Sequence, residues 1–531
     1  MTGALDFRNR ARLFDEVEGQ TFDLIVIGAG VTGAGVARDA AMRGFSVALV
    51  EARDIASGTS SRSSKMIHGG LRYMAQGDLA LVHEAASERK AVEHIAPHLT
   101  RRTPFVIPAK SAGAMTKLRA GLWAFEKLGG VPKDRRHEVW SKADIERLEP
   151  AIDASDLTGA VAYPEYLTED ARLTLANVRS AHEHGAAVLT YAPVESFILE
   201  GRRATGVVVG DSLTGQGGRA RLHGRAIVNA GGPWVDALRQ LEDPSAAAQL
   251  QLTKGVHLVV PHARLPVTRT VIMPAADRRS VFAVPKGEHT YIGTTDTFYP
   301  EVHDWPRIEA EDVDYLLAAA KARFSSPPLT HADITAAWSG VRPLVAQAGK
   351  SASEISRKDE VWTGPAGVIA IAGGKLTAYR KMAERIVDDV ERAVGRPHMP
   401  CLTAEEALVG GDLDPPKSIA DLTASLGSRR DAERLVALYG SEAGAIVADG
   451  ADVAAEARHA VLAEGALTLE DYWVRRSVRA WFDHGAGLDA LKPAAQEMAK
   501  LLDWSASQTS AQIKACRRLH DDSLSAITQS T

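Results

Sequence analysis

The chain has 531 residues, of which 45% are hydrophobic and 24% charged, with a net charge of -5. This length predicts two or three domains, and the negative charge excludes general nucleic-acid binding, which needs a strongly basic face. The two cysteines cannot form a disulfide framework or a cysteine metal site, and no apolar run resembles a secretory signal or a membrane span, so we expect a cytoplasmic protein without a metal.

Residues 22–54 carry the clearest structural signal of the chain. The apolar run 24–27 is typical of a parallel strand buried on both faces, and a small-residue helix and a second apolar strand, 47–50, follow it. Gly28, Gly30 and Gly33 form a G-x-G-x-x-G turn, in which they permit the tight turn, the approach of a pyrophosphate and close helix packing. Glu51, at the end of the second strand, can accept hydrogen bonds from ribose hydroxyls and would repel a 2'-phosphate.

The middle of the chain returns to the same predicted sheet. Residues 187–210 read as strands in hairpins with a turn at Gly201, after a helix that Gly185 closes. Two further buried strands, 225–234 and 367–372, end at glycine pairs, as the first strand does. The turn motif alone does not distinguish NAD from FAD, but a chain that returns repeatedly to its sheet favours the extended cofactor FAD.

Residues 114–130 mix Lys and Arg with Leu, Trp and Phe at helical spacing. A basic amphipathic helix of this kind can lie on an anionic membrane surface. The alternative is a helix packed over the protein, with its charges solvated.

The composition changes after Gly395. We expect a connection at 401–408, a Gly- and Pro-bearing linker at 409–417, a helical domain at 418–520 and a fraying polar tail at 523–531. A basic cluster between tryptophans, 473–482, fits a domain contact, a dimer contact or an exposed patch, and the sequence does not rank these.

Several motifs, taken together and in order, resemble the FAD-dependent glycerol-3-phosphate dehydrogenases. They are SSKMIHGGLRYM (63–74), KGVHLVVP (254–261), YIGTTDT (291–297), WSGVRPL (338–344) and AGGKLTAYRKMAE (372–384), with a looser match at LEDYWVRRSVRAWF (469–482). The resemblance implies oxidation of sn-glycerol 3-phosphate to dihydroxyacetone phosphate, with electrons passing through FAD to a quinone or another acceptor.

The resemblance also implies the fold and its division. We expect an α/β protein whose FAD-dependent region spans 20–400, with a Rossmann-like FAD-binding domain, an amino-acid-oxidase-like antiparallel substrate domain and a helical C-terminal domain. The FAD-binding segments are expected at about 20–105, 160–250 and 335–395. The substrate domain is expected at about 105–160 and 250–335.

Three residues are the candidates for catalysis: His257, Arg342 and Lys375. In the resembled family the histidine faces the substrate, and an imidazole can accept the hydroxyl proton; a structural strand histidine is the alternative. Arg342 offers a bidentate fork to a phosphate, and Lys375 adds a charge for the flavin or the phosphate. For Arg380, a role in the pocket and a role in a salt bridge are equally good interpretations.

The resemblance assigns the loop at 59–74 to both ligands. Hydroxyls in its first half are expected to bind FAD, and its glycine pair is expected to lie close to the flavin ring. His68 is expected to brace the loop. Arg72 and Tyr73 are expected to line the substrate pocket together with the three catalytic candidates. The expected cofactor-binding residues are Gly28, Gly30, Gly33, Glu51, Thr59, Ser60, Ser63, Ser64, Gly69, Gly70, Ala230, Gly231, Gly373, Gly374, Lys375, Leu376 and Thr377.

Other functions and partners stay open at this point. An oxygen-using glycerol-3-phosphate oxidase, an FAD oxidase of amino or 2-hydroxy acids and a non-enzymatic FAD scaffold are the alternatives. The expected partners are glycerol 3-phosphate and a quinone or other electron acceptor. Peripheral contact with the inner face of the cytoplasmic membrane and a homodimer are further expectations.

Overall fold

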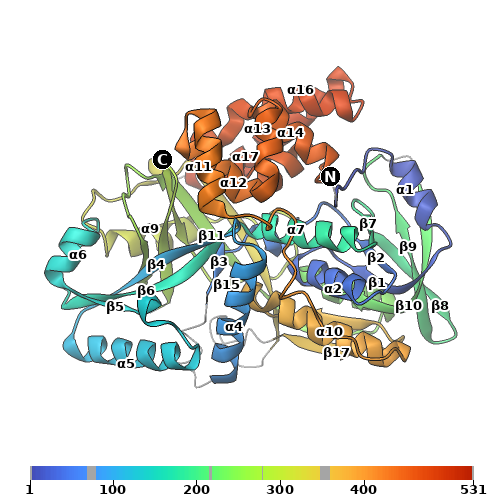
Figure 1. Cartoon of the computed structure of the whole chain (residues 1–531), viewed down its shortest axis with the longest axis horizontal. Helices are drawn as coiled ribbons and strands as arrows, with labels where there is room; N and C mark the ends of the chain where they lie inside the picture. The colour runs from blue at the N-terminus through green and yellow to red at the C-terminus, as the bar shows by residue number, and fades with distance from the viewer. Residues whose placement is uncertain (1–2, 69–78, 215–217, 278, 347–358, 529–531) are drawn as a thin grey trace.

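The computed structural model describes residues 3–68, 79–214, 218–277, 279–346 and 359–528. Two sheets lie side by side, and a layer of C-terminal helices lies across both (Figure 1). Among the described residues, no helix is both long and apolar enough to cross a membrane.

The first sheet gathers strands that are far apart in sequence. Its order is β17 (Glu360–Thr363), β18 (Ile369–Ala372), β10 (Arg219–Asn229), β1 (Thr21–Ile27), β2 (Val47–Val50) and β7 (Ala187–Leu189), with the hairpin of β8 (Val194–Glu200) and β9 (Arg203–Gly210) attached to β10. The strands β18, β10, β1, β2 and β7 run parallel, so the two late glycine-ended strands join the first sheet as the sequence predicts.

Three helices cover one face of this sheet. They are α2 (Val31–Met42), α7 (Asp170–Glu183) and α10 (Tyr379–Val394), whose apolar side chains share one core with β1 and β2. The small side chains of α2 let it contact both neighbouring helices, because alanines and glycines bring helix backbones close together.

The second sheet is antiparallel except between β12 and β4. Its order is β15 (Thr297–Phe298), β11 (Leu250–Pro261), β14 (His289–Gly293), β13 (Ser280–Lys286), β12 (Thr270–Pro274), β4 (Thr100–Ala109), β6 (Gly159–Thr168) and β3 (Met66–Ile67). In addition, β16 (Ala336–Val345) pairs with β11, and β5 (Glu138–Ser141) pairs with β6. The helix α5 (Ala112–Leu128) packs on β4 and β6, and α9 (Ala310–Lys321) contacts β11 to β14.

Two expected domain boundaries differ from this arrangement. The sequence assigned residues after 160 and after 335 to the FAD-binding domain, but β6 pairs along its length with β4, and β16 with β11. Both strands therefore belong to the substrate sheet. A buried apolar strand has the same pattern in either sheet, so the pattern does not identify its partner.

The C-terminal domain is helical, as expected, but its first and last helices do not follow the expected boundaries. Its helices are α11 (Pro415–Leu426), α12 (Arg429–Tyr439), α13 (Ala443–Ala448), α14 (Val453–Leu462), α15 (Arg479–Phe482), α16 (Leu491–Leu501) and α17 (Ala506–Thr528). The helix α11 starts inside the expected linker, and α17 includes residues 523–528, for which fraying was expected. That expectation was wrong because Ile527 is buried in the core of the second sheet.

The C-terminal domain is joined to the first sheet by a buried salt bridge. Asp54, just after β2, is fully buried and accepts from Arg476 at 2.5 and 2.7 Å and from Arg475 at 2.5 Å. Burial alone would raise the pKa of Asp54, but the two arginines lower it below its usual value. The basic cluster at 473–482 therefore includes a domain contact.

A second buried cluster links α7 to the same domain. Arg172 binds Glu464 at 2.6 Å, Arg179 binds Glu442 at 2.6 Å, and His459 lies 3.5 Å from both carboxylates. Burial alone would lower the pKa of His459, but the two glutamates raise it to about 9. His459 is therefore a cation at neutral pH and carries part of the domain contact.

Replacing His459 with glutamine is expected to change how stability depends on pH. The pKa of the wild-type imidazole is about 9 when folded and 6.5 as an isolated group, so its contribution is complete below pH 6.5 and disappears as the pH rises through 9. The difference corresponds to about 3 kcal/mol. Between pH 6.5 and 10, the melting temperature should fall more steeply in the wild type than in His459→Gln.

The exposed His303, which pairs with Glu301 at the surface, gives the matched control. His303→Gln should follow the wild-type curve, because an exposed pair contributes little. Melting curves of the wild type and His459→Gln that run parallel over this pH range would contradict the assignment.

Candidate functional site

A cavity of about 1520 Å³ extends from the first sheet to the second. At the first sheet its wall is formed by the turns that follow β1, β10 and β18, which include Gly28, Gly231 and Gly373. These parallel strands end at the same edge, the usual place for a ligand in such a sheet. The cavity combines segments from three distant parts of the chain.

The first glycine turn leaves no space for side chains. Gly28 has a φ of +105°, and a Cβ atom there would lie 2.6 Å from the carbonyl oxygen of Ala230. A Cβ atom on Gly33 would lie 1.9 Å from the carbonyl oxygen of Gly28. Gly30 caps α2 and lines the cavity, so the turn presents backbone N–H groups and a helix N-terminus to a ligand.

The loop after β2 is tied to this turn. The half-buried carboxylate of Glu51 accepts from the backbone N–H groups of Ala29 at 2.7 Å and Arg53 at 2.9 Å, while desolvation raises its pKa. The Ser60 hydroxyl accepts from the backbone N–H of Val31 at 2.9 Å. Glu51 and Ser60 both line the cavity, beside the glycine turn.

Two further hydroxyl side chains of this loop, those of Thr59 and Ser63, point in different directions. The Thr59 hydroxyl donates to the carbonyl of Val341 on β16, which joins the loop to the second sheet. The backbone N–H and the hydroxyl of Ser63 donate to Asp170 at 2.9 and 2.8 Å. The cavity wall includes Thr59, Ser63 and Asp170.

A buried pair that the sequence analysis missed supports this loop. The Nζ atom of Lys65 donates to Asp170 at 2.6 Å and to the carbonyl of Ser61 at 3.1 Å. Lys65 adopts the left-handed backbone region at a φ of +55°, which brings its ammonium group back under the loop. Asp170 begins a helix 105 residues later, so no sequence pattern indicated the pair.

His257, the candidate base on β11, does not lie at the cavity wall. Its Nε2 atom is 2.8 Å from the Ser64 hydroxyl, which does line the cavity, and its ring stacks on Trp338 at 4.7 Å. Only 1% of the residue is exposed. Burial, and then the charges of Arg342 and Lys65, lower its pKa well below the usual value, so the imidazole is neutral.

Arg342, on β16, lines the cavity and is hydrogen-bonded to the segment 294–296. Its guanidinium donates to the Asp296 carboxylate at 3.1 Å and the Thr294 hydroxyl at 2.9 Å. Gly255 gives it room, because a Cβ atom there would lie 2.2 Å from Nη2 of Arg342. The side chain is 19% exposed and can therefore meet a ligand.

The turn after β18 lies beside Arg342, because the backbone N–H of Gly373 donates to the carbonyl of Pro343 at 3.1 Å. Gly373 and Gly374 have φ values of +79° and +83°, and Lys375 then caps a short 3-10 helix (Leu376–Ala378) before α10. Gly373, Gly374, Lys375, Leu376 and Thr377 line the cavity. Thr377 exchanges hydrogen bonds of 3.2 and 3.3 Å with the backbone of His68, which agrees with a bracing role for this part of the loop.

Some candidates lie elsewhere or outside the described residues. Arg380 forms a buried salt bridge to Glu88, at 2.5 Å, and is not part of the cavity wall, so the structure favours the salt-bridge alternative. Ala230 and Gly231 line the cavity directly beside Gly28. Gly69, Gly70, Arg72 and Tyr73 lie outside the described residues, and their roles stay predictions.

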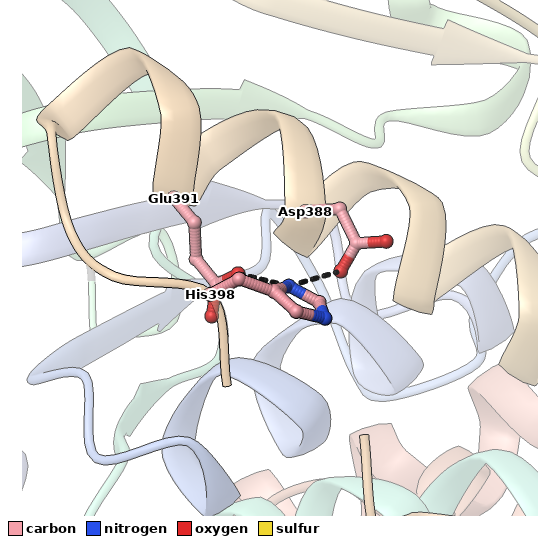
Figure 2. A group of neighbouring side chains, drawn as sticks. All are labelled: Asp388, Glu391 and His398. Atoms are coloured by element: carbon pink, nitrogen blue, oxygen red, sulfur yellow. Dashed lines mark hydrogen bonds and ion pairs between the residues drawn. The ribbon is translucent and has the colours of Figure 1, made fainter. Parts of the chain in front are cut away.

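Two groups of side chains in the described part of the chain are close enough to hold a metal ion, but arginines already neutralise both. Figure 2 shows the first, in which Nδ1 of His398 lies 2.9 Å from Glu391 and 3.7 Å from Asp388. Arg43 reaches the same two carboxylates at 3.2 and 2.6 Å. The second group is the cluster of Glu442, His459 and Glu464, which Arg172 and Arg179 bind.

Comparisons with known proteins agree on one family. Residues 23–380 match the family described as FAD dependent oxidoreductase, and residues 401–509 match the C-terminal domain of alpha-glycerophosphate oxidase. The chain is 38% identical over 502 residues to the aerobic glycerol-3-phosphate dehydrogenase of Bacillus subtilis (strain 168), covering 89% of this chain and 90% of that protein.

Solved structures agree with this likeness. The glycerol-3-phosphate dehydrogenase from Bacillus halodurans, complexed with FAD, superposes with a TM-score of 0.82 at 32% identity, covering 98% of this chain and 99% of that one. The glycine oxidase from Geobacillus kaustophilus shares only the fold, with a TM-score of 0.51 at 20% identity, covering 73% of this chain and 98% of that one.

Proposed function

The chain belongs to the family of FAD-dependent oxidoreductases, and we propose that it oxidises sn-glycerol 3-phosphate to dihydroxyacetone phosphate and passes the electrons to a quinone. The main support for this substrate is the likeness to glycerol-3-phosphate dehydrogenases, which extends over nearly the whole chain and includes the C-terminal domain. Amino-acid oxidases such as the glycine oxidase share the fold alone.

The residues of the cavity fit FAD. The glycine turn and the N-terminus of α2 suit the diphosphate, Glu51 suits a ribose, and the backbone of Gly373 and Gly374 can approach a flat ring because neither has a side chain. When bound, FAD supplies the acceptor for the substrate hydride. The remaining chemistry, anchoring an anion and accepting a proton, falls to side chains of the protein.

Arg342 is the proposed anchor for the substrate phosphate. Its guanidinium is fixed by Asp296 and Thr294, so little rotational freedom is lost when it binds an anion. Lys375 adds positive charge from the turn after β18, which also lines the cavity. A dianion held between the two would keep the carbinol carbon in one place.

The Ser64 hydroxyl is the proposed path for the proton. Because His257 lies behind Ser64 and not at the wall, Ser64 can accept a hydrogen bond from the substrate hydroxyl while it donates to the imidazole. The lowered pKa keeps His257 neutral and able to accept. This proposal moves Ser64 from the expected cofactor contacts to the proton path.

Replacing Arg342 with methionine should weaken substrate binding while FAD stays bound. A charged hydrogen bond to an anion contributes about 1.5–3 kcal/mol, so the concentration of glycerol 3-phosphate that half-bleaches the flavin without oxygen should rise about 10- to 100-fold. Arg202→Met, in the exposed turn between β8 and β9, is the control and should leave this concentration unchanged. Unchanged affinity in Arg342→Met would remove Arg342 from the phosphate site.

Ser64→Ala and His257→Gln should each slow anaerobic flavin reduction about 100-fold, the usual size of a proton-transfer contribution. Because both act on one proton, the double variant should be no slower than the slower single variant. The wild-type reduction rate should show no fall as the pH is lowered through 6.5, because the pKa of His257 lies well below that value. If Ser64→Ala instead loses FAD and is reduced normally once reconstituted, Ser64 is a cofactor contact.

We also propose that α5 contacts an anionic membrane surface, where a quinone is found. The helix exposes Lys117, Arg119 and Lys127 together with Trp123, which is 59% exposed, and Leu128, which is 38% exposed. Exposed large apolar side chains beside cations are typical of helices that lie in a membrane interface. The buried side of the same helix packs on β4 and β6.

Reversing two charges of this helix tests the membrane contact. Each lysine or arginine near an anionic surface contributes about 1 kcal/mol, so the double substitution Lys117→Glu and Arg119→Glu should lower binding to vesicles containing phosphatidylserine at least tenfold. Flotation at low and high salt measures this. Arg202→Glu, on the exposed β8–β9 turn, is the control, and equal flotation of wild type and the α5 variant would exclude α5 as the contact.

A further inference from the structure

The cavity opens to solvent at one end of the second sheet, at the turn that joins β12 to β13. Three residues there line the cavity, and we name them the mouth: Asp277, Arg279 and Ser280. Asp277 and Ser280 are exposed, and Arg279 is half-buried, with 26% of its side chain exposed. Residues that line a cavity and are also exposed mark a place where solvent and solutes enter it.

One residue joins the mouth to the proposed phosphate anchor. The guanidinium of Arg279 donates to the backbone carbonyl of Asp296 at 2.6 Å, and Arg342 donates to the carboxylate of the same Asp296 at 3.1 Å. Arg279 belongs to the mouth, whereas Arg342 is on β16 and is 19% exposed. The two arginines therefore follow each other along the cavity wall, and the more exposed one comes first.

Arg279 is held in place by more than one neighbour. Its Nε atom donates to the Asp277 carboxylate at 2.6 Å, and its guanidinium lies over the ring of Tyr315, on α9, at 4.9 Å from the centroid. The hydroxyl of Tyr315 donates to Asp277 at 2.9 Å. The contacts of Arg279 with Asp296 and Tyr315 do not depend on the charge of Asp277, so Arg279 keeps its place when another anion replaces that carboxylate.

A phosphate dianion can replace Asp277 as the partner of Arg279. The side chains of the pair are 26% and 41% exposed, and exposed ion pairs contribute little net stability because water solvates both charges. A guanidinium offers phosphate oxygens two parallel hydrogen bonds, and it attracts a double charge more strongly than a single one. The ion pair at the mouth is therefore one that an incoming phosphate can exchange.

The position of Arg279 favours the substrate over the cofactor as its ligand. The glycine turn and the N-terminus of α2, which suit the FAD diphosphate, belong to the first sheet, whereas Arg279 and Arg342 belong to the second. The proposed substrate carries a dianionic phosphate that must travel from solvent to Arg342. A cation at the entrance of a cleft raises the association rate of an anionic ligand, and changing such a charge alters mainly that rate.

We propose that Arg279 is the entry residue for the substrate: it captures the phosphate at the mouth and passes it to Arg342, while Asp277 competes with the phosphate and limits its stay at the mouth. This inference rests on the proposed function, because it needs a substrate that carries a phosphate. It assigns Arg279 to the approach of the substrate and not to the chemical step. A change of charge at position 279 therefore alters how fast the cavity fills, and not how fast the flavin is reduced once the cavity is full.

Anaerobic stopped-flow reduction of the flavin by glycerol 3-phosphate separates entry from chemistry. In about 20 mM salt, Arg279→Met should lower the second-order rate constant at low substrate about fivefold, as expected for one screened charge acting on a dianion. The limiting rate at saturating substrate should stay within about twofold of the wild type. In about 1 M salt, where the Debye length is about 3 Å, the second-order rate constants of variant and wild type should converge.

Asp277→Asn gives the opposite test, because it removes the competing charge and leaves Arg279 in place. The second-order rate constant should rise about twofold in low salt. A purely structural role of the ion pair predicts a fall in both variants, since each breaks the same contact. Arg279→Lys keeps the charge and should retain at least about half of the wild-type rate constant, which tests the role of the charge even if methionine disturbs the turn.

The exposed pair of Lys417 and Asp421 on α11 provides matched controls in the C-terminal domain. Lys417→Met and Asp421→Asn change the net charge by the same amounts and should leave the rate constant unchanged. An unchanged rate constant in Arg279→Met, a fall in both mouth variants, or a loss that high salt does not remove would overturn the entry role. If glycerol 3-phosphate does not reduce the flavin of the wild type at all, the proposed function itself is wrong, and the entry role is wrong with it.

Discussion

The buried carboxylate of Asp54 fixes the position of the loop on which the cavity depends. It binds Arg475 and Arg476 of the C-terminal domain and lies three residues after Glu51, where the loop leaves the first sheet. Buried charges are tolerated only when they are paired, and breaking such a pair costs about 3–5 kcal/mol. The C-terminal domain therefore holds the start of the loop, and the pair of Lys65 and Asp170 holds its end.

The same domain supports the other side of the site through aromatic packing. Trp481 and Phe482 contact Trp338 at 5.5 and 5.9 Å, and Trp338 stacks on the imidazole of His257. His257 then meets Ser64 at the end of the loop. The C-terminal domain therefore positions both partners of the proposed proton path, although it contributes no side chain to the wall formed by the described residues.

The sequence predicted the features that follow from local sterics. Gly28 and Gly33 could be assigned because no other residue fits their turn, and the late strands could be placed because each ends in the same kind of turn. It did not predict which sheet receives β6 and β16, since buried strands look alike. The pair of Asp54 and Arg476 is separated by 422 residues, and that of Lys65 and Asp170 by 105, so no spacing indicated them. His257 was found by resemblance, but its place behind Ser64 joins segments 193 residues apart, which only the structure shows.

The separation of Asp54 from its arginines also sets an order of events during synthesis. The first sheet needs β18, near residue 370, and the loop after β2 needs Arg475 and Arg476, which leave the ribosome later still. Until then Asp54 lacks its two cationic partners, and the loop is held only by contacts such as those of Glu51, Ser60 and Lys65. The salt bridge that joins the loop to the C-terminal domain therefore forms only when nearly the whole polypeptide has been made, and a chain truncated before Arg475 would lack it.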